Sequence, residues 1–155
     1  MKKILFIQLI LLSAGVFAAD LPDPILTPGA ANPSVTQDNI HKTICVSGWT
    51  STIRPSVSYT NRLKKQQMAA MHLPGKMSDY EEDHLISLEL GGSPADPKNL
   101  WPQPWTGQWN AHKKDVVETE LNKQVCSGKL TLAEAQHMIS TNWITAYTQL
   151  TKPSK

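Results

Sequence analysis

The spacing of apolar residues along the chain changes between the period of a strand and the period of a helix. Residues 80–90 show a strand-like period, in which Leu85, Ser87 and Glu89 alternate with the apolar Ile86, Leu88 and Leu90, and this predicts a strand. Gly91 and Gly92 then supply a turn in which a positive φ is available. Residues 99–101 predict a short returning strand, which the prolines at 102 and 104 stop. The centre of the chain is therefore expected to be a strand, a turn and a second strand.

Helical patterns lie on both sides of this centre. Residues 61–71 lack Gly and Pro and are rich in Lys, Gln, Met and Ala, so we expect a helix there. Residues 109–124 carry apolar side chains at near-helical spacing and predict a second helix. A third helix is expected from Thr131, which forms a capping-box pattern with Glu134, to about Leu150. Together these elements predict a small single domain of the α+β class.

The first third of the chain gives weaker signals. Residues 19–39 contain four prolines, so we expect an extended, flexible leader. The β-branched residues at 43–46 and 52–53 predict one or two short strands, and Pro55 would confine them to a sheet edge. The compact domain is expected to span residues 40–150, with a short tail at residues 151–155.

The first 18 residues have the pattern of a secretory signal peptide. Lys2 and Lys3 precede an apolar run that ends at Val16, and cleavage after Ala18 places small residues before the cut. A membrane anchor is the competing interpretation, but the run is shorter than the roughly 20 apolar residues of a spanning helix. We therefore expect a secreted or periplasmic protein with no membrane segment in its mature form.

Charge alone does not indicate the partner of this protein. The chain has 15 Lys+Arg and 13 Asp+Glu, and removal of Lys2 and Lys3 leaves 13 of each. Six cations and no acid lie between residues 39 and 78, namely Lys42, Arg54, Arg62, Lys64, Lys65 and Lys76. Such a block is typical of a solvated surface and equally of a surface that binds a phosphate backbone.

The two cysteines, Cys45 and Cys126, predict one disulfide, because a cysteine pair in an exported protein is usually oxidised. In the chain-entropy model, this link would constrain the unfolded chain by roughly 4–5 kcal/mol. A metal site is the less favoured alternative, since neither cysteine has a second Cys or His at ligand spacing.

Three motifs carry candidate chemistry: Asp83-His84 followed by Leu-Ile-Ser-Leu-Glu-Leu-Gly-Gly, then Asn99-Leu-Trp-Pro-Gln-Pro, then Asn110-Ala-His-Lys-Lys-Asp. Their order and spacing resemble the HNH, or His-Me finger, nuclease superfamily, and more closely its exported members. The resemblance implies a ββα-metal core, in which a β-hairpin and the following helix hold one divalent ion. Two departures are visible: this chain has no CxxC zinc pairs, and Ser87 stands where many members have Pro.

The chemistry of phosphodiester hydrolysis explains these residue types. An imidazole takes a proton from water near neutral pH, so we expect His84 to be the general base. Asp83 offers a hard oxygen ligand for Mg²⁺, with Mn²⁺ or another divalent ion as alternatives. The resemblance implies that Asn110 is the second ligand, with His112 as the alternative, and that Asn99 braces the loop and orients His84.

The resulting expectation is a monomeric nuclease that hydrolyses DNA with little sequence preference, because no base-reading module accompanies the motif. RNA remains open as a substrate. The basic side chains expected to contact phosphates are Lys113, Lys114, Arg62, Lys64 and Lys65. The alternative is an exported binding domain that keeps the ββα scaffold without turnover, and the formally neutral mature chain favours that alternative.

Overall fold

The computed structural model of the protein describes residues 20–152. The predicted signal peptide and the last three residues of the predicted tail lie outside this range. Among the helices of residues 20–152, none has both the length and the apolar character needed to cross a bilayer.

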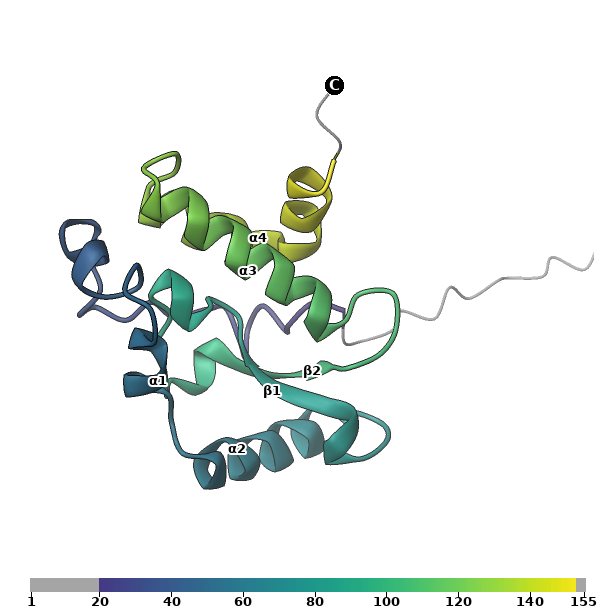
Figure 1. Ribbon diagram of the computed structural model, residues 1–155. Coiled ribbons are helices and arrows are strands. Elements are labelled where there is room, and N and C mark those ends of the chain that lie inside the picture. The colour runs from purple at the N-terminus through teal and green to yellow at the C-terminus, as the bar shows by residue number, and fades with distance from the viewer. Residues whose placement is uncertain (1–19, 153–155) are drawn as a thin grey trace, which may run out of the picture.

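An antiparallel hairpin occupies the middle of the molecule (Figure 1). Strand β1 (Tyr80–His84) pairs with β2 (Leu100–Pro104), so that His84 lies opposite Leu100. The expectation of a strand through residue 90 is wrong, because the chain turns after His84 into a short 3-10 helix, η3 (Leu88–Leu90). The prolines do not stop β2. They are tolerated because β2 has a partner on one side only, and its other edge needs no N–H donor.

The predicted helices are present with shifted ends. Helix α2 (Val57–Ala70) packs on one side of the hairpin, while α3 (Ala111–Cys126) and α4 (Leu132–Leu150) pair with each other on the other side (Figure 1). The capping box at Thr131 and Glu134 is confirmed. Helix α4 bends at Asn142, which has non-helical φ and ψ angles.

The main core lies between α3, α4 and η3. Its largest fully buried member is Trp143, which packs with Leu121 and Ile139. The buried cluster that forms this core includes no residue of β1 or β2, so the hairpin lies at the margin of the core. Because the sheet of residues 20–152 has two strands, one edge of β1 has no partner strand.

The strands expected at residues 43–46 and 52–53 are absent from the described chain. A 3-10 helix, η1 (Gln37–Lys42), is followed by turns and by a short helix, α1 (Trp49–Ile53). Gly48 precedes α1 with φ of 79°, a left-handed conformation that interrupts extended backbone. No partner strand exists for this segment, because the sheet of residues 20–152 has two strands, which pair with each other.

The predicted disulfide is confirmed. Cys45, just before α1, is bonded to Cys126 at the end of α3, with a Cα–Cα distance of 5.6 Å. The bond therefore fastens the segment that carries α1 to the helix that packs over the hairpin.

The proline-rich segment before η1 is irregular, but it packs against the domain. Thr27 is fully buried and Val35 nearly so. The backbone N–H of Ala30 donates to the side chain of Asn99, and Ala31 forms a bridge with Gly92. Composition predicted the lack of regular structure but not this packing.

Candidate active site

The alternation along β1 separates its polar side chains between two sides. Glu81 and Asp83 lie on the side of α3, as the contact of Asp83 with Lys114 shows. Glu82 lies on the side of α2, where burial raises its pKa to about 8 although Lys64 opposes the shift. His84 is the last residue of the strand, at the point where the backbone turns toward η3.

His84 is 95% buried and has one hydrogen-bond partner. Its Nε2 lies 2.9 Å from the carbonyl oxygen of Pro94, which can only accept, so Nε2 carries the hydrogen and Nδ1 is the basic nitrogen. The pKa of His84 is lowered to about 4, mainly by burial and to a smaller extent by Arg54 and Lys114, while the hydrogen bond to Pro94 and the nearby Glu118 oppose this shift. At neutral pH the imidazole is therefore in the form that accepts a proton.

Asn99 organises the loop that connects the two strands. Its side chain is fully buried, and its Oδ1 accepts from the N–H groups of Ile86 and Ala30 at 2.9 and 3.2 Å. Its Nδ2 donates to the carbonyl oxygens of Ile86 and Ser93 at 2.9 and 3.0 Å. The hydrogen bonds of the Asn99 side chain go to other residues than His84, and one of them holds the backbone one residue before Pro94.

The two glycines of the turn are required by this geometry. Gly91 has φ of 69°, as its sequence context predicted. At Gly92, an added Cβ would collide with the carbonyl oxygen of Ile86 and crowd Nδ2 of Asn99. The Gly-Gly pair therefore allows the loop to close tightly around Asn99.

Lys114 lies in the interior instead of on a phosphate-binding surface. Its ammonium is fully buried, donates to Glu118 Oε1 at 2.5 Å and to the carbonyl oxygen of His84 at 2.7 Å, and forms an ion pair with Asp83 Oδ2 at 2.7 Å. Burial alone would lower the pKa of Lys114, but Asp83 and Glu118 more than offset it and raise that pKa. A phosphate in solvent does not reach this ammonium, so the expected substrate contact does not fit the position of Lys114.

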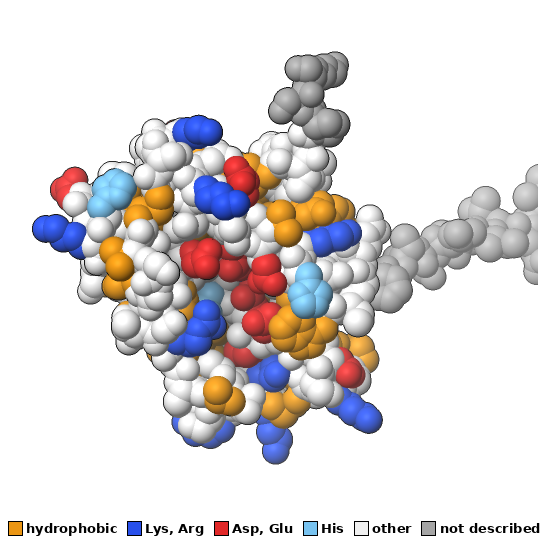
Figure 2. Space-filling view, viewed as in Figure 1, with side chains coloured by type: hydrophobic (Ala, Val, Ile, Leu, Met, Phe, Trp, Pro, Cys, Tyr) orange, Lys and Arg blue, Asp and Glu red, His pale blue; other side chains and the backbone are white. Residues whose placement is uncertain are grey.

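Five carboxylates lie close to one another on the α3 side of the hairpin and form what we call the acidic cluster: Glu81, Asp83, Glu89, Asp115 and Glu118. Figure 2 shows acidic side chains together in the middle of this face, between α3 and β1. Burial, then repulsion from Asp83 and other members, raises the pKa of Glu81 to about 7. The cluster holds more negative charge than Lys114 balances, so it would attract a cation from solvent.

The two candidate helix ligands lie at the start of α3. Asn110 is the N-cap: its Oδ1 accepts from the N–H of Lys113 at 3.2 Å, and its Nδ2 donates to Gly107. His112 is exposed, stacks near Trp105 and approaches Asp115 at 3.8 Å. Among residues 20–152, the ion pair of Asp83 is with Lys114 and not with His112.

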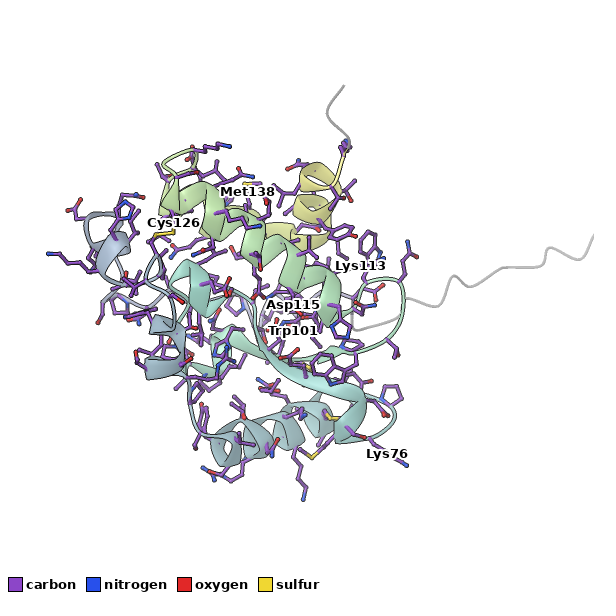
Figure 3. The ribbon with its side chains drawn as sticks, in the orientation of Figure 1. Lys76, Trp101, Lys113, Asp115, Cys126 and Met138 are labelled. Atoms are coloured by element: carbon purple, nitrogen blue, oxygen red, sulfur yellow. A yellow bond between two sulfur atoms is a disulfide. The ribbon has the colours of Figure 1, made fainter. Side chains whose placement is uncertain are left out.

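The basic residues expected to bind phosphate are separated by the fold. Lys64 is occupied within the protein, because its Nζ donates to the carbonyl oxygens of Met77 and Tyr80. Arg62 and Lys65 are exposed on α2. The ammonium of Lys113 donates to the carbonyl oxygen of Gln108 and lies over the ring of Trp109. Figure 3 shows Lys113 apart from Asp115, which lies between α3 and the hairpin.

Two contributions to this site were not identified from sequence. Arg54, exposed at the end of α1, lowers the pKa values of both His84 and Glu89, so its guanidinium lies near both. Within residues 20–152 it makes no ion pair. Glu118 could have been found from its place one helical turn after Lys114. For Arg54 the sequence offers no signal beyond its membership of the basic block.

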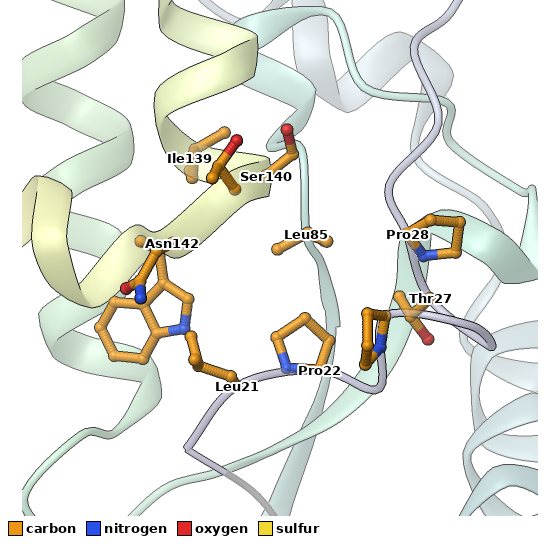
Figure 4. A pocket seen from close by; sticks show the side chains of 11 residues that line it. Leu21, Pro22, Thr27, Pro28, Leu85, Ile139, Ser140 and Asn142 are labelled. Atoms are coloured by element: carbon orange, nitrogen blue, oxygen red, sulfur yellow. The ribbon is translucent and has the colours of Figure 1, made fainter.

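A separate pocket lies away from this face. It has a volume of about 470 Å³ and lies between the segment that starts near Leu21 and the bend of α4 at Asn142 (Figure 4). Its lining is apolar or neutral, so it lacks acid–base groups. The candidate chemistry therefore belongs to the open face at β1 and α3.

Comparison of the chain with protein-family models, curated proteins and solved structures found no match.

Proposed function

We propose that this protein is an exported, divalent-metal-dependent endonuclease that hydrolyses phosphodiester bonds of DNA, with His84 as the general base. The observation that carries the proposal is a neutral imidazole whose Nδ1 is free, placed next to Asp83 and beside a group of carboxylates. The order of the elements, β1, β2 and α3, agrees with the motif order of the nuclease superfamily that the sequence resembles.

His84 would take the proton from the attacking water. Nδ1 accepts that proton, while the Nε2 bond to Pro94 keeps the ring in one orientation. The water oxygen then bonds to phosphorus as the bond to the 3′ oxygen breaks. A bound phosphate is anionic and favours the protonated ring, so the pKa of His84 rises from about 4 when substrate binds.

The donor set of this face fits a hard divalent cation, since carboxylate oxygens are the ligands that Mg²⁺ and Mn²⁺ prefer. Asp83 would hold the ion, together with a residue of α3. Within residues 20–152, no three His, Cys, Asp or Glu side chains converge as a complete ligand set. Water and substrate phosphate would therefore fill most coordination positions, and the bound ion would stabilise the charge that develops on the phosphate and leaving oxygen.

Cations at the border of the acidic cluster would position the nucleic acid. Figure 2 shows Lys and Arg side chains along the α2 border of this face. Arg62 and Lys65 belong to that helix, and Arg54 lies nearer to His84. A phosphate backbone that crosses the open edge of β1 would meet Arg54 close to the base.

A nicking assay with supercoiled plasmid tests this proposal. The disulfide-bonded protein should nick plasmid with Mg²⁺ and not with EDTA, and His84→Ala should lower the rate by about 100-fold or more. His137→Ala, which changes an exposed histidine of α4, is the matched control and should retain the wild-type rate. Cleavage that persists in EDTA, or in His84→Ala with intact fold, would overturn the assignment. Parallel assays with RNA establish the substrate range.

The acidic cluster also favours a second candidate, a binding domain without turnover, because without a metal ion this face repels polyphosphate. Folded wild-type protein that binds Mg²⁺ but leaves both DNA and RNA intact would support this candidate.

The proposed compartment is the periplasm or the outside of the cell. The disulfide between Cys45 and Cys126 is compatible with such an oxidising location.

A further inference from the structure

Lys114 occupies the place where the proposed function puts a cation. Its ammonium donates hydrogen bonds to Glu118 Oε1 and to the carbonyl oxygen of His84, and it forms an ion pair with Asp83 Oδ2 at 2.7 Å. None of this ammonium is exposed to solvent. The side chain thus ties α3 to the last two residues of β1.

The contact with Asp83 limits what that carboxylate can offer to a metal ion. Oδ2 of Asp83 is buried and already holds the ammonium, and the whole side chain is 14% exposed. A divalent ion arriving from solvent would share Asp83 with a fixed positive charge a few ångströms away. Because like charges repel strongly at such separations in a protein, the two cations compete.

We infer that Lys114 is a resident counter-ion that competes with the divalent cation for Asp83, so that the ammonium sets the metal affinity of the site. This inference rests on the proposed function, which assigns Asp83 as a metal ligand. It gives Lys114 a role toward the metal instead of toward the substrate. It also explains how Asp83 and Glu118 stay together in the protein before a metal binds.

Metal titration without nucleic acid tests the inference. Calorimetry with MnCl₂ should show that Lys114→Met binds Mn²⁺ about tenfold more tightly than the wild type, or more, because a like charge beside the ion is removed. Lys113→Met is the matched control: it removes the same charge from the neighbouring position, where the ammonium bonds to Gln108 and lies over Trp109. Its Mn²⁺ affinity should stay close to the wild-type value. Equal affinities in the two variants would overturn the inference.

A second measurement needs no substitution, in case Lys114→Met does not fold with two uncompensated carboxylates. A buried, fully bonded ammonium exchanges its protons slowly, so the Nζ resonance of Lys114 can be followed by ¹⁵N NMR in the wild type. This resonance should shift or disappear as Mg²⁺ is added, with the same midpoint as a calorimetric titration of the wild type with MgCl₂. A resonance that stays unchanged at saturating Mg²⁺ would overturn the inference.

The two proposals fail separately. If the wild type cleaves plasmid with Mg²⁺ while the Lys114 resonance stays unchanged, the competition is wrong and the nuclease assignment stands. If Mg²⁺ moves the Lys114 resonance while plasmid stays intact, the competition is supported and the nuclease assignment fails.

Discussion

Nε2 of His84 donates a hydrogen bond to the carbonyl oxygen of Pro94 at 2.9 Å, and this single contact fixes both the tautomer and the orientation of the ring. Pro94 lies in the loop between the two strands, and that loop is held by Asn99 through the carbonyl oxygen of Ser93. The residue that would act on water is therefore oriented by backbone ten residues away in the sequence.

The pH dependence of cleavage follows from the burial of His84. Because burial lowers the pKa of His84 to about 4, the basic form persists well below pH 6.5. We expect kcat/KM, which reports the free enzyme, to be flat with respect to this group down to about pH 5 and to fall near pH 4. Measuring kcat/KM on a short oligonucleotide, with circular dichroism at each pH, checks this. A half-maximal rate near pH 6.5, with a folded protein, would show an exposed or unperturbed base.

The elements predicted most successfully were those whose signal is local. The capping box at Thr131 and the turn at Gly91 depend on neighbouring residues only, and both are present as expected. The strands expected at residues 43–46 and 52–53 failed for a non-local reason. β-branched residues favour a strand only when another strand is available to pair with them, and here the hairpin leaves none.

The candidate site shows the same division. The sequence predicted that Asp83 and His84 lie on a strand, and both belong to β1. It did not show that Lys114 points inward, since a lysine on an amphipathic helix is usually solvated. That outcome depends on Asp83 lying opposite α3, which is a tertiary relationship. Arg54 was likewise one of six similar cations until the fold brought α1 next to the end of β1.

Arg54 offers a test of the substrate path. In Arg54→Gln we expect kcat/KM to fall by about tenfold or more, because a charge-assisted contact with phosphate is lost. The pKa of His84, followed by NMR, should rise, since Arg54 lowers it in the wild type. Lys129→Gln removes an exposed cation in the turn after α3 and serves as the control. An unchanged kcat/KM together with a raised His84 pKa would place Arg54 near the base but outside the substrate path.

Asn99 should be important for stability as well as for the site. Asn99→Ala removes four hydrogen bonds and leaves buried backbone groups without partners, so we expect the free energy of unfolding to fall by about 2–4 kcal/mol. Urea unfolding measures this. Asn61→Ala, at an exposed position of α2, should change the value by no more than about 0.5 kcal/mol. A loss of similar size in both variants would argue against the network.

The disulfide should be needed for a stable fold. Reduction of the bond between Cys45 and Cys126 releases a sequence separation of 81 residues, and we expect it to cost about 2–5 kcal/mol of unfolding free energy. Urea unfolding with and without dithiothreitol measures the effect, and the Cys45→Ser, Cys126→Ser double variant should match the reduced protein. Identical unfolding midpoints with and without dithiothreitol would show that the bond adds no stability.

Glu82 should make the protein less stable as the pH rises. Both of its carboxylate oxygens are buried without a hydrogen-bond partner, and burial raises its pKa to about 8. A carboxyl group whose pKa is higher in the native state than in the unfolded state contributes stability that is fully present below its unfolded pKa. For Glu82 this stability is lost as the pH rises through the native pKa of about 8. We therefore expect the unfolding free energy of Glu82→Gln, relative to that of the wild type, to increase by on the order of 1–2 kcal/mol from pH 6 to pH 9. Urea unfolding at both pH values measures the difference, and Glu120→Gln, at a position 41% exposed on α3, should show none. If the stability of Glu82→Gln and the wild type changes equally with pH, then Glu82 is ionised in the native protein and has a partner that stabilises its charge.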